Sequence, residues 1–576
     1  MGSMALKLEE QLLKIRGAAE EREAMRRATA SGIPYLDLRT TPVKVDALQL
    51  IPEERARAAK AASFELKKPT IALAVYDPND EKVKELIHEF EAQSLTVKLF
   101  AISLRGLEHL WSFYTFVTPE KPPITSRVNI ERDRIVKLSS ELLGLSHASQ
   151  ASASFDWKNG SVTEFFEIVL SGALANRASD IHFEPGERSV KIRYRIDGIL
   201  HDITDAVSRD FYPSIVSRIK LLSNLKINIA DRPQDGRFTI GLPTKEIEIR
   251  VAVAPSEFGE IVVLRVLDPD VINLTLKELG LRDDDHAIIE AELARPHGMI
   301  LNTGPTGSGK TSTLYAFLRA KQSTEIKIIT IEDPIEYHLS GIEQTQVDEE
   351  AGYTFANGLR SIMRQDPDAI LVGEVRDRDT AEIAIQAALT GHLVFSTVHA
   401  NEAAGAIPRL LDLGAKPVSV APALNLIIGQ RLVRRLCASC RVPATVNEEL
   451  HGRIQKFIER LPKRVRKELY EHRELFEPKG CAACSGIGYK GRIAIFELLT
   501  NDPSYGGTTS SNEAASSDPE FEALVARSAP ESAIRAYAVG HGMVTMQEDG
   551  ILKVISGTTT FAEVEEATGR IAWLRE

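Results

Sequence analysis

The eight residues from Gly304 to Thr311 read GPTGSGKT, and they constrain the fold of this chain more than any other segment. They match the pattern GxxxxGK[ST] and stand between the apolar run Met299–Leu301 and the helix-like run TSTLYAFLRAK. A strand, a glycine-rich loop and a helix in this order present backbone N–H groups at the start of the helix, where they attract phosphate. We therefore expect an α/β core that binds a nucleotide at this loop.

Within the loop, Lys310 is expected to reach the β- and γ-phosphates, and the hydroxyl of Thr311 to bind Mg²⁺. The alternative, a glycine-rich turn without a ligand, would require the whole motif and its strand–loop–helix setting to arise by coincidence. The predicted nucleotide-binding residues are Gly304, Pro305, Thr306, Gly307, Ser308, Gly309, Lys310, Thr311 and Ser312.

The chain has 576 residues, which predicts about three to five domains, because a single core does not grow to this size. Its formal net charge of −11 argues against a surface that coats nucleic acid or anionic lipid. No apolar stretch reaches the ~18 residues that a membrane span needs. The start, MGSMALKLEEQLLKIR, carries charges where a signal peptide needs an apolar core, so a cytoplasmic location is expected.

Composition changes along the chain divide it into regions. The runs TPEKPP and SHASQASASFDWKNG predict a linker, and YGGTTSSNEAASSDP predicts a disordered loop. Apolar residues at helical spacing near the start predict a surface helix, with a partner-docking helix as the alternative. The predicted regions are an N-terminal helix (1–32), a small α/β domain (33–116), a linker (117–160), a strand-rich α+β domain (161–272), the nucleotide-binding core (273–432), a tetracysteine subdomain (433–500) and a helical C-terminal region (501–576) with the disordered loop at 504–518.

Acids and histidines follow the apolar strands that come after the loop. In KIITIEDPIEY the apolar strand is followed by Glu332, Asp333 and Glu336, and in DAILVGEVRD it is followed by Glu374. TGHLVFSTVHAN places His392 and His399 at the two ends of a further apolar strand. In α/β sheets the carboxyl ends of strands lie where ligands bind, and an acid there can hold Mg²⁺. These segments indicate a site that hydrolyses the nucleotide.

Four segments in order, GPTGSGKTST, TIEDPIEY, RQDPDAILVGEVRD and GHLVFSTVHAN, resemble the Walker A, Asp box, Walker B and His box of bacterial type II secretion and type IV pilus assembly ATPases. The resemblance is dense over roughly 160–500 and fainter over 33–116. It implies an α/β fold in which a RecA-like P-loop ATPase domain follows a PAS-like α+β domain and a small N-terminal α/β domain. It also implies a homohexamer with ATP bound between the PAS-like and RecA-like domains.

The resemblance further implies roles for individual residues. Glu374 would be the Walker B acid, and Glu332 or Glu336 would orient or deprotonate the attacking water, with Glu332 preferred. His392 and His399 would lie near the γ-phosphate.

Arginines complete the set that the resemblance implies. Arg237 and Arg250 match the PAS-like arginines that reach the nucleotide, with simple salt bridging as the alternative. Arg360 and Arg364, four apart in GLRSIMRQDPD, match a further pair. The nearby Arg193, Arg195 and His182 are interpreted instead as solvated or structural residues.

Two CxxC pairs, CASC and CAAC, contain the four cysteines of the chain. Four thiolates suffice for a closed, structural tetrahedral zinc site. Two redox pairs or free thiols are the alternatives. By resemblance, this tetracysteine insert belongs to the secretion and pilus-assembly branch rather than to retraction motors. The predicted zinc ligands are Cys437, Cys440, Cys481 and Cys484.

The leading hypothesis is a cytoplasmic hexameric ATPase motor that uses ATP, Mg²⁺ and Zn²⁺. It would act at the inner membrane through a platform protein that moves pilins or pseudopilins. A RecA-like nucleic-acid motor is the alternative, disfavoured by the acidic charge. A GTPase would need an NKxD-type segment, which the chain lacks, and a non-hydrolysing scaffold would not need Glu374 and His399. Residues 1–30 do not predict cyclic dinucleotide binding.

Overall fold

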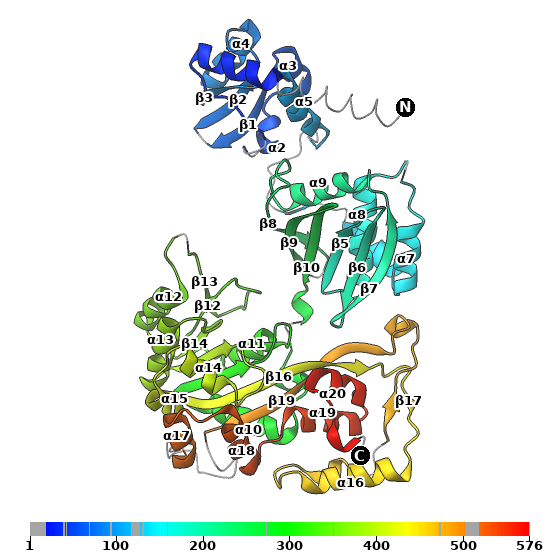
Figure 1. The fold of residues 1–576 in the computed structure, drawn as a ribbon, viewed down its shortest axis with the longest axis vertical. Helices are drawn as coiled ribbons and strands as arrows, with labels where there is room; N and C mark the ends of the chain where they lie inside the picture. Colours follow the sequence, from blue (N-terminus) through cyan, green and yellow to red (C-terminus); the bar gives the residue numbers. More distant parts are fainter. Residues whose placement is uncertain are drawn as a thin grey trace.

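The computed structural model describes residues 19–38, 41, 43–67, 69–92, 95–116, 127–128, 132–157, 159–243, 245–271, 274–349, 351–471, 474–501 and 518–574. Figure 1 shows them as an N-terminal domain, a middle domain and a larger domain that carries the phosphate-binding loop, arranged along the long axis. Within these described ranges, no helix is both long enough and apolar enough to cross a bilayer.

The N-terminal domain is a small sheet covered by helices. Strand β2 lies between an antiparallel β1 and a parallel β3, and apolar residues from strands and helices form its core. Tyr35 forms a bridge with Ala101 of β3, and β1 begins shortly after α3 ends. The elements are α2 (Val45–Leu48), α3 (Glu53–Ala58), β1 (Ala61–Lys67), β2 (Thr70–Val75), α4 (Glu81–Ala92), β3 (Thr96–Ala101), α5 (Leu104–Ser112) and η1 (Phe113–Phe116).

A helix over residues 19–31 packs against this domain. Ala24 and Ala28 are buried, and the Arg27 guanidinium lies 3.7 Å from the centre of the Tyr76 ring. The described part of the predicted N-terminal helix is therefore held by packing, while residues 1–18 lie outside the described ranges.

The middle domain is a sheet with the strand order β4-β8-β9-β10-β5-β6-β7. Its strands bury alternate residues, as in β6, because one face packs on helices and the other does not. The helices are α6 (Arg132–Glu141), α7 (Leu145–Ala153), α8 (Val162–Ala175) and α9 (Tyr212–Leu222). The strands are β4 (Arg127–Val128), β5 (Asp180–Pro185), β6 (Val190–Ile196), β7 (Ile199–Val207), β8 (Gln234–Gly241), β9 (Glu246–Ser256) and β10 (Gly259–Leu267).

Part of the segment predicted as a linker instead belongs to the middle domain. Residues Leu145–Ala153 form α7, whose Ala148 is buried in the core of that domain. The rings of Phe155 and Trp157 lie 5.1 and 4.8 Å from Phe165 of α8. The Ser- and Ala-rich composition gave no periodic signal, because small residues can pack closely without an apolar stripe.

The large domain contains the sheet β13-β12-β14-β15-β11-β16-β19, which is parallel except for β19. Every residue of β11, β14 and β15 is buried, as expected for parallel strands with helices on both faces. The strands are β11 (Gly298–Thr303), β12 (Ile328–Glu332), β13 (Glu343–Gln346), β14 (Ala369–Val372), β15 (Leu393–Val398), β16 (Leu424–Leu436) and β19 (Tyr489–Thr500). The helices are η2 (Pro269–Val271), η3 (Leu276–Leu279), α10 (Asp283–Ala294), α11 (Lys310–Lys321), α12 (Phe355–Ile362), η4 (Met363–Gln365), α13 (Arg378–Leu389), α14 (Ala406–Asp412) and α15 (Pro417–Ala423).

The long strands β16 and β19 extend beyond the sheet and carry the cysteine segments at one end. An arm between the cysteine pairs contains α16 and packs against the C-terminal helices. The predicted disordered loop at 504–518 lies outside the described residues apart from Asp518, which caps α17. The remaining elements are β17 (Val442–Pro443), α16 (Glu448–Arg460), η5 (Lys467–Leu469), β18 (Phe476–Glu477), η6 (Ala482–Cys484), α17 (Pro519–Ala526), α18 (Glu531–Gly540), α19 (Met546–Ile555), α20 (Phe561–Thr568) and η7 (Ala572–Leu574).

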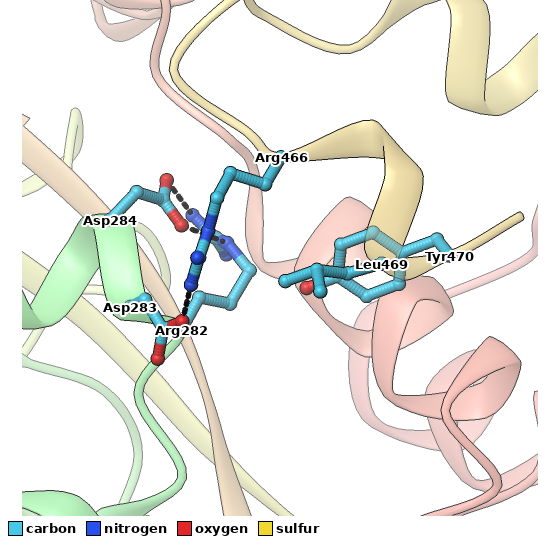
Figure 2. Close-up of a pocket in the computed structure, with 6 residues that line it drawn as sticks. All are labelled: Arg282, Asp283, Asp284, Arg466, Leu469 and Tyr470. Carbon is cyan, nitrogen blue, oxygen red and sulfur yellow. Dashed lines mark hydrogen bonds and ion pairs between the residues drawn. The ribbon is translucent and has the colours of Figure 1, made fainter.

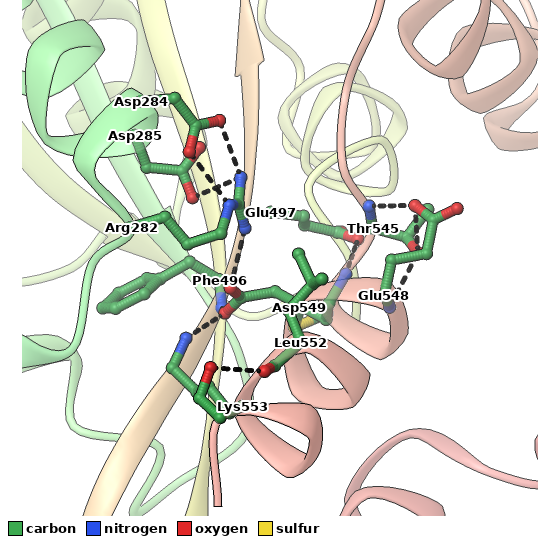
Figure 3. A network of polar contacts seen from close by, with 12 residues as sticks. Arg282, Asp284, Asp285, Phe496, Glu497, Thr545, Glu548, Asp549, Leu552 and Lys553 are labelled. Carbon is green, nitrogen blue, oxygen red and sulfur yellow. Dashed lines mark hydrogen bonds and ion pairs between the residues drawn. The ribbon is translucent and has the colours of Figure 1, made fainter. Parts of the chain in front are cut away.

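A buried ionic network joins the start of α10 to the C-terminal helices. Arg282 forms ion pairs with Asp285 and Asp549, each at 2.7 Å, and Asp549 also pairs with Lys553 at 2.5 Å (Figure 3). From the arm, Arg464 pairs with Asp285 at 2.8 Å. The C-terminal region and the arm are therefore attached to the large domain by charge as well as by apolar packing.

A small cleft opens beside this network. It is lined by Arg282, Asp283 and Asp284 from the start of α10 and by Arg466, Leu469 and Tyr470 from the arm (Figure 2). Arg466 pairs with Asp283 across it, so its charges are compensated within the chain. The cleft belongs to the attachment of the arm.

Candidate active site

The phosphate-binding loop has the backbone of a ligand cradle. Gly304, Gly307 and Gly309 have φ values of 149°, 81° and 89°, in the region that favours glycine. A Cβ on Gly304 would lie 2.4 Å from the carbonyl oxygen of Gln430 on the neighbouring strand β16. The loop therefore requires glycine there for both conformation and space. It leads from β11 directly into α11, which begins at Lys310.

Lys310 folds back over the loop. Its Nζ donates hydrogen bonds to the carbonyl oxygens of Gly304 at 2.7 Å and Pro305 at 3.1 Å. Burial lowers the pKa of Lys310, while the nearby carboxylate of Glu374 opposes that shift. The ammonium group thus lies within the cradle, where a phosphate oxygen would replace the carbonyl acceptors. Pro305, Thr306 and Thr311 are exposed on the loop, as a ligand-binding segment requires.

The acids and one histidine of the sequence prediction meet at one edge of the sheet. Strand β12 ends at Glu332, and Glu374 and His399 follow the last residues of β14 and β15. Because these strands run parallel to β11, their carboxyl ends lie at the same edge as the phosphate-binding loop. The hydroxyl of Thr303 joins loop and His box directly, since it donates to the carbonyl of Ala400 at 2.8 Å and accepts the N–H of Ala400 at 2.9 Å.

Glu332 is enclosed by hydrogen-bond donors. Its carboxylate accepts from the hydroxyl of Thr330 at 2.6 Å, from the amide of Gln344 at 3.1 Å and from the hydroxyl of Tyr315 on α11. Burial and the neighbouring Glu332 raise the pKa of Tyr315, which therefore stays protonated as a donor. The Glu332 side chain is only 4% exposed. It binds the end of β12 to the helix that follows the phosphate-binding loop.

Glu336 lies at the boundary between the middle and large domains. Its carboxylate forms an ion pair of 2.9 Å with Arg250 of β9, which also donates to the carbonyl of Ile335 at 2.6 Å. The side chains of Arg250 and Glu336 are 23% and 30% exposed, so solvent still reaches both. Arg237 lies opposite Arg250 on β8, is largely exposed and approaches Glu248 at 3.9 Å. Arg250 thus joins the middle domain to the segment that follows β12.

Glu374 takes part in a chain of charges across the strand ends. Its carboxylate lies 3.3 Å from Nε2 of His399 and pairs with Arg376. Arg376 in turn pairs with Asp333 at 3.1 Å. The Glu374 side chain is 15% exposed and lies close enough to Lys310 for its charge to act on the lysine ammonium.

Two residues of the site were missed by sequence reasoning. The amide of Gln430 donates to the carbonyl of Ser308 at 2.9 Å and its oxygen accepts from Asn302 at 2.9 Å, which fixes the loop against β16. Arg376 joins the two acidic strand ends. Arg376 stands two residues after Glu374, so its proximity could have been inferred, whereas nothing in the sequence connects Gln430 to a loop more than a hundred residues earlier.

Three predicted residues are not brought to this edge. His392 precedes β15, and its carbonyl accepts from the N–H of Gly298 at the start of β11, so it lies at the amino edge of the sheet, opposite the loop. Arg360 lies on α12 and bonds Asn357 at 3.1 Å. Arg364 is exposed in the turn that leads to the start of β14. Both arginines have the right helical spacing, but spacing does not report on which edge of a sheet a helix ends.

Arg193, Arg195 and His182 of the middle domain were interpreted from the sequence as solvated or structural residues. Arg193 pairs with Glu184, and Arg195 donates to the carbonyl of Gly198 at 2.9 Å. Burial lowers the pKa of His182, which lies on the same face of the sheet.

The four cysteines form a compact cluster. Their Sγ atoms all lie within 4.8 Å of one another, with Cys437 3.9 Å from Cys481 and Cys440 3.8 Å from Cys484. A tetrahedral ion with bonds of about 2.3 Å to sulfur would place neighbouring sulfurs about 3.8 Å apart. Burial raises the pKa of Cys440 to about 12, whereas the N–H groups of Cys481 and Gly488 lower that of Cys484 to about 7, so the fit rests on the spacing of the sulfurs. The cluster therefore fits a thiolate-bound metal ion.

A parallel sheet, a glycine-rich phosphate-binding loop at its carboxyl edge and acids on the adjacent strand ends define a P-loop nucleoside triphosphatase. Comparisons with known proteins agree. A family model described as "Type II/IV secretion system protein" matches residues 156–566. The chain belongs to this type II/IV secretion system protein family, and it is an ATPase of the secretion and pilus-assembly class.

Individual relatives agree with this assignment. Type II secretion system protein E of Dickeya dadantii (strain 3937) is 42% identical over 407 residues, which cover 71% of this chain and 76% of that protein. The type IV pilus assembly ATPase PilB of Myxococcus xanthus (strain DK1622) is 35% identical over 535 residues, which cover 92% of this chain and 88% of that protein.

A solved structure supports the fold. The ATPase DotB of Legionella pneumophila aligns with a TM-score of 0.50 at 20% identity, over 72% of this chain and 97% of that chain. At this identity the likeness concerns the fold alone.

Proposed function

We propose that this chain is a homohexameric ATPase motor that powers type IV pilus assembly or type II protein secretion. It would act at the cytoplasmic face of the inner membrane, associated peripherally through an inner-membrane platform protein, without nucleic acid as a partner. The observation that carries the proposal is the contact of Arg250 with Glu336 and Ile335. This contact lies between two domains and beside the nucleotide site, so hydrolysis and domain movement would be coupled.

In this proposal ATP is held by the loop Gly304–Ser312. Lys310 exchanges its two carbonyl acceptors for phosphate oxygens, and the N–H groups at the start of α11 point at the same phosphates. Thr311 and Glu374 would hold Mg²⁺, which would neutralise the charge that develops on the phosphates. His399, 3.3 Å from Glu374, would contact the γ-phosphate, so that the conformation at the end of β15 would depend on the bound nucleotide.

Glu336 is a better candidate than Glu332 for orienting the attacking water. The carboxylate of Glu332 already accepts hydrogen bonds from Thr330, Gln344 and Tyr315 and is buried. A water that is to be deprotonated needs a free acceptor within hydrogen-bond reach. Glu336 is partly exposed, and among the described residues its ion-pair partner is Arg250, which lies on a different domain. Movement of that domain would free the Glu336 carboxylate.

Three further arginines, Arg237, Arg360 and Arg364, also have roles in this proposed hydrolysis of ATP. Arg237 lies next to Arg250 across the strand pair and would follow it toward the phosphates when the domains close. Arg360 and Arg364 lie away from the loop of their own chain, so we place them at the nucleotide of the adjacent subunit. Zn²⁺ bound by the four cysteines would be structural, because all four positions are filled by the protein.

Replacement of the phosphate-binding lysine tests the function. Lys310→Ala should lower ATP turnover by about a hundredfold or more, because an oriented charge on the transferred phosphate contributes on that order. Phosphate release is measured on the full-length protein, with Lys327→Ala, at the opposite edge of the sheet, as the matched control. Turnover in Lys310→Ala equal to that of the control would refute the assignment.

A further inference from the structure

The cysteine cluster lies outside the nucleotide site, at the far end of the long strands β16 and β19. Residues 437–440 directly follow β16, and residues 481–491 comprise the second cysteine pair and the first residues of β19. We call these two segments the cysteine knuckle. Figure 1 shows this end of the large domain near the lower ends of β6 and β7 of the middle domain. Among the described residues, two hydrogen bonds connect the knuckle to the middle domain.

The first contact involves a hairpin turn. The N–H of Gly491 donates to Oδ2 of Asp197 at 2.7 Å. Asp197 and Gly198 are the two residues between β6 and β7, with φ values of 49° and 92°, as in the tight turns that prefer Asp-Gly or Asn-Gly. Arg195 donates to the carbonyl of Gly198 and supports the turn from its own strand. The acceptor is therefore held in a fixed position.

The second contact reaches a buried cap. The hydroxyl of Ser485 lies 3.1 Å from Oδ1 of Asn176, the residue that ends α8. The Asn176 amide donates to the carbonyls of Leu142 and Gly172, and its oxygen accepts the N–H of Gly144. Ser485 thus touches a residue that is built into the middle domain.

The sulfur atoms determine the shape of the loop that makes both contacts. The N–H groups of Cys481 and Gly488 donate to Sγ of Cys484, each at 3.2 Å, and the N–H of Cys437 donates to the carbonyl of Gly488. Ser485 immediately follows Cys484, and Gly491 is three residues beyond Gly488. Removing an ion from the cluster would release the sulfurs that hold this loop.

From these contacts we propose that the cysteine knuckle is a docking surface for the middle domain, so that the metal site sets the position of that domain over the nucleotide site. In the middle domain, Asn176 and Asp197 accept the hydrogen bonds; in the knuckle, Ser485 and Gly491 donate them. The same domain contacts the Asp-box segment through Arg250, so the knuckle holds it at a second point. The effect on ATP hydrolysis rests on the proposed role of Arg250, whereas the docking itself does not.

Hydrogen exchange of the full-length protein tests the docking. Asp197→Gly removes the acceptor and suits the positive φ, and Asp197→Asn keeps both the acceptor and the turn. Asp202→Asn is the matched control, since Asp202 lies within β7 and pairs with Lys191 of β6 rather than with the knuckle. Each protein is compared after incubation with Zn²⁺ and after treatment with EDTA, with metal content measured by elemental analysis.

In the Zn²⁺-loaded protein, Asp197→Gly should speed exchange at the Gly491 amide and in residues 196–199 by about tenfold, because a hydrogen bond to a charged acceptor is lost. Asp197→Asn and Asp202→Asn should remain near the wild type. EDTA should cause the same increase in the wild type and no further increase in Asp197→Gly. All three variants should retain their zinc.

Equal exchange at Gly491 in the wild type with and without Zn²⁺, or in Asp197→Gly and Asp197→Asn, would overturn the docking. ATP turnover gives the separate readout. Asp197→Gly should lower kcat, and it should have no effect when Arg250 is already replaced by Ala. If Lys310→Ala leaves turnover intact, the proposed function fails while the exchange result still decides the docking.

Discussion

At the scale of single residues, the site separates two glutamates that stand only four positions apart. Glu332 accepts three hydrogen bonds in the interior, whereas Glu336 faces solvent and the middle domain. A carboxylate enclosed by donors serves to hold structure, because each donor left without an acceptor costs roughly 1–3 kcal/mol. A carboxylate with a single movable partner can exchange that partner for a water. The two side chains are thus suited to different tasks.

This difference predicts opposite outcomes for the same substitution. Glu336→Gln should lower kcat by about a hundredfold, the usual contribution of a positioned base, with nucleotide affinity and thermal stability near the wild type. Glu332→Gln should lower the thermal midpoint, because the amide places donors against Thr330 and Tyr315. Turnover and thermal unfolding of both variants provide the measurement. A Glu336→Gln protein with normal kcat, beside an inactive but equally stable Glu332→Gln protein, would reverse the assignment.

Sequence reasoning found the residues that follow recognisable strand ends. Glu374 and His399 could be predicted because parallel strands bring their carboxyl ends to one edge. Gln430 could not, because its hydrogen bonds join β16 to a loop that is remote in the chain. His392 was predicted to lie near the γ-phosphate, but it stands at the beginning of a strand and therefore lies at the opposite edge of the sheet. The apolar pattern of a strand does not show which of its two ends lies at the ligand-binding edge.

At the scale of elements, strand β16 connects the phosphate-binding loop of the large domain to the cysteine cluster. Its residue Gln430 holds the phosphate-binding loop, and its last residue directly precedes the ligand candidate Cys437. β19 returns antiparallel from the cysteine knuckle into the sheet. A paired ribbon of this kind is stiff, because both strands share a ladder of backbone hydrogen bonds. The ribbon gives a physical connection between nucleotide site and knuckle.

Secondary structure was predicted most accurately where the sequence shows a regular apolar pattern that the fold buries. The apolar runs after the phosphate-binding loop became the buried parallel strands β12, β14 and β15. α7 escaped prediction, because Ala148 and Ser152 are small and are buried by neighbours rather than by hydrophobic periodicity. Such packing depends on α8 and on the aromatic residues beside it, which a local window does not include.

At the scale of the whole molecule, the ionic network at Arg282 attaches the C-terminal region to the ATPase core. Arg282→Met should destabilise this attachment by up to about 3–5 kcal/mol, because the buried carboxylates of Asp285 and Asp549 each lose one cationic partner and keep Arg464 and Lys553. Thermal unfolding and limited proteolysis of the C-terminal helices provide the measurement. Arg378→Met is the control, since Arg378 pairs with Glu382 at the surface, where such pairs contribute about 0–1 kcal/mol. Equal stability of both variants would show that the network is not needed.

The assembly of several chains gives the last prediction. The strand order places β12 three strands from β11, and α12 packs beside β12, so Arg360 is remote from the loop of its own chain. Arg364 lies just after α12, where the chain returns toward the amino edge of the sheet. If these arginines serve the adjacent subunit, Lys310→Ala and the double variant Arg360→Ala/Arg364→Ala should each be inactive alone. Mixed subunits would then contain interfaces with an intact loop on one side and intact arginines on the other.

In a ring of heterologous interfaces formed from equal amounts of both variants, about a quarter of the interfaces would be complete. The mixture should therefore recover about that share of wild-type turnover per chain, after the subunits have been exchanged by dilution and reassembly. Mass photometry checks that mixed hexamers form. If the arginines served the loop of their own chain, no mixed interface would be complete, and the mixture would remain as inactive as its components. Recovery on mixing therefore separates action between subunits from action within one.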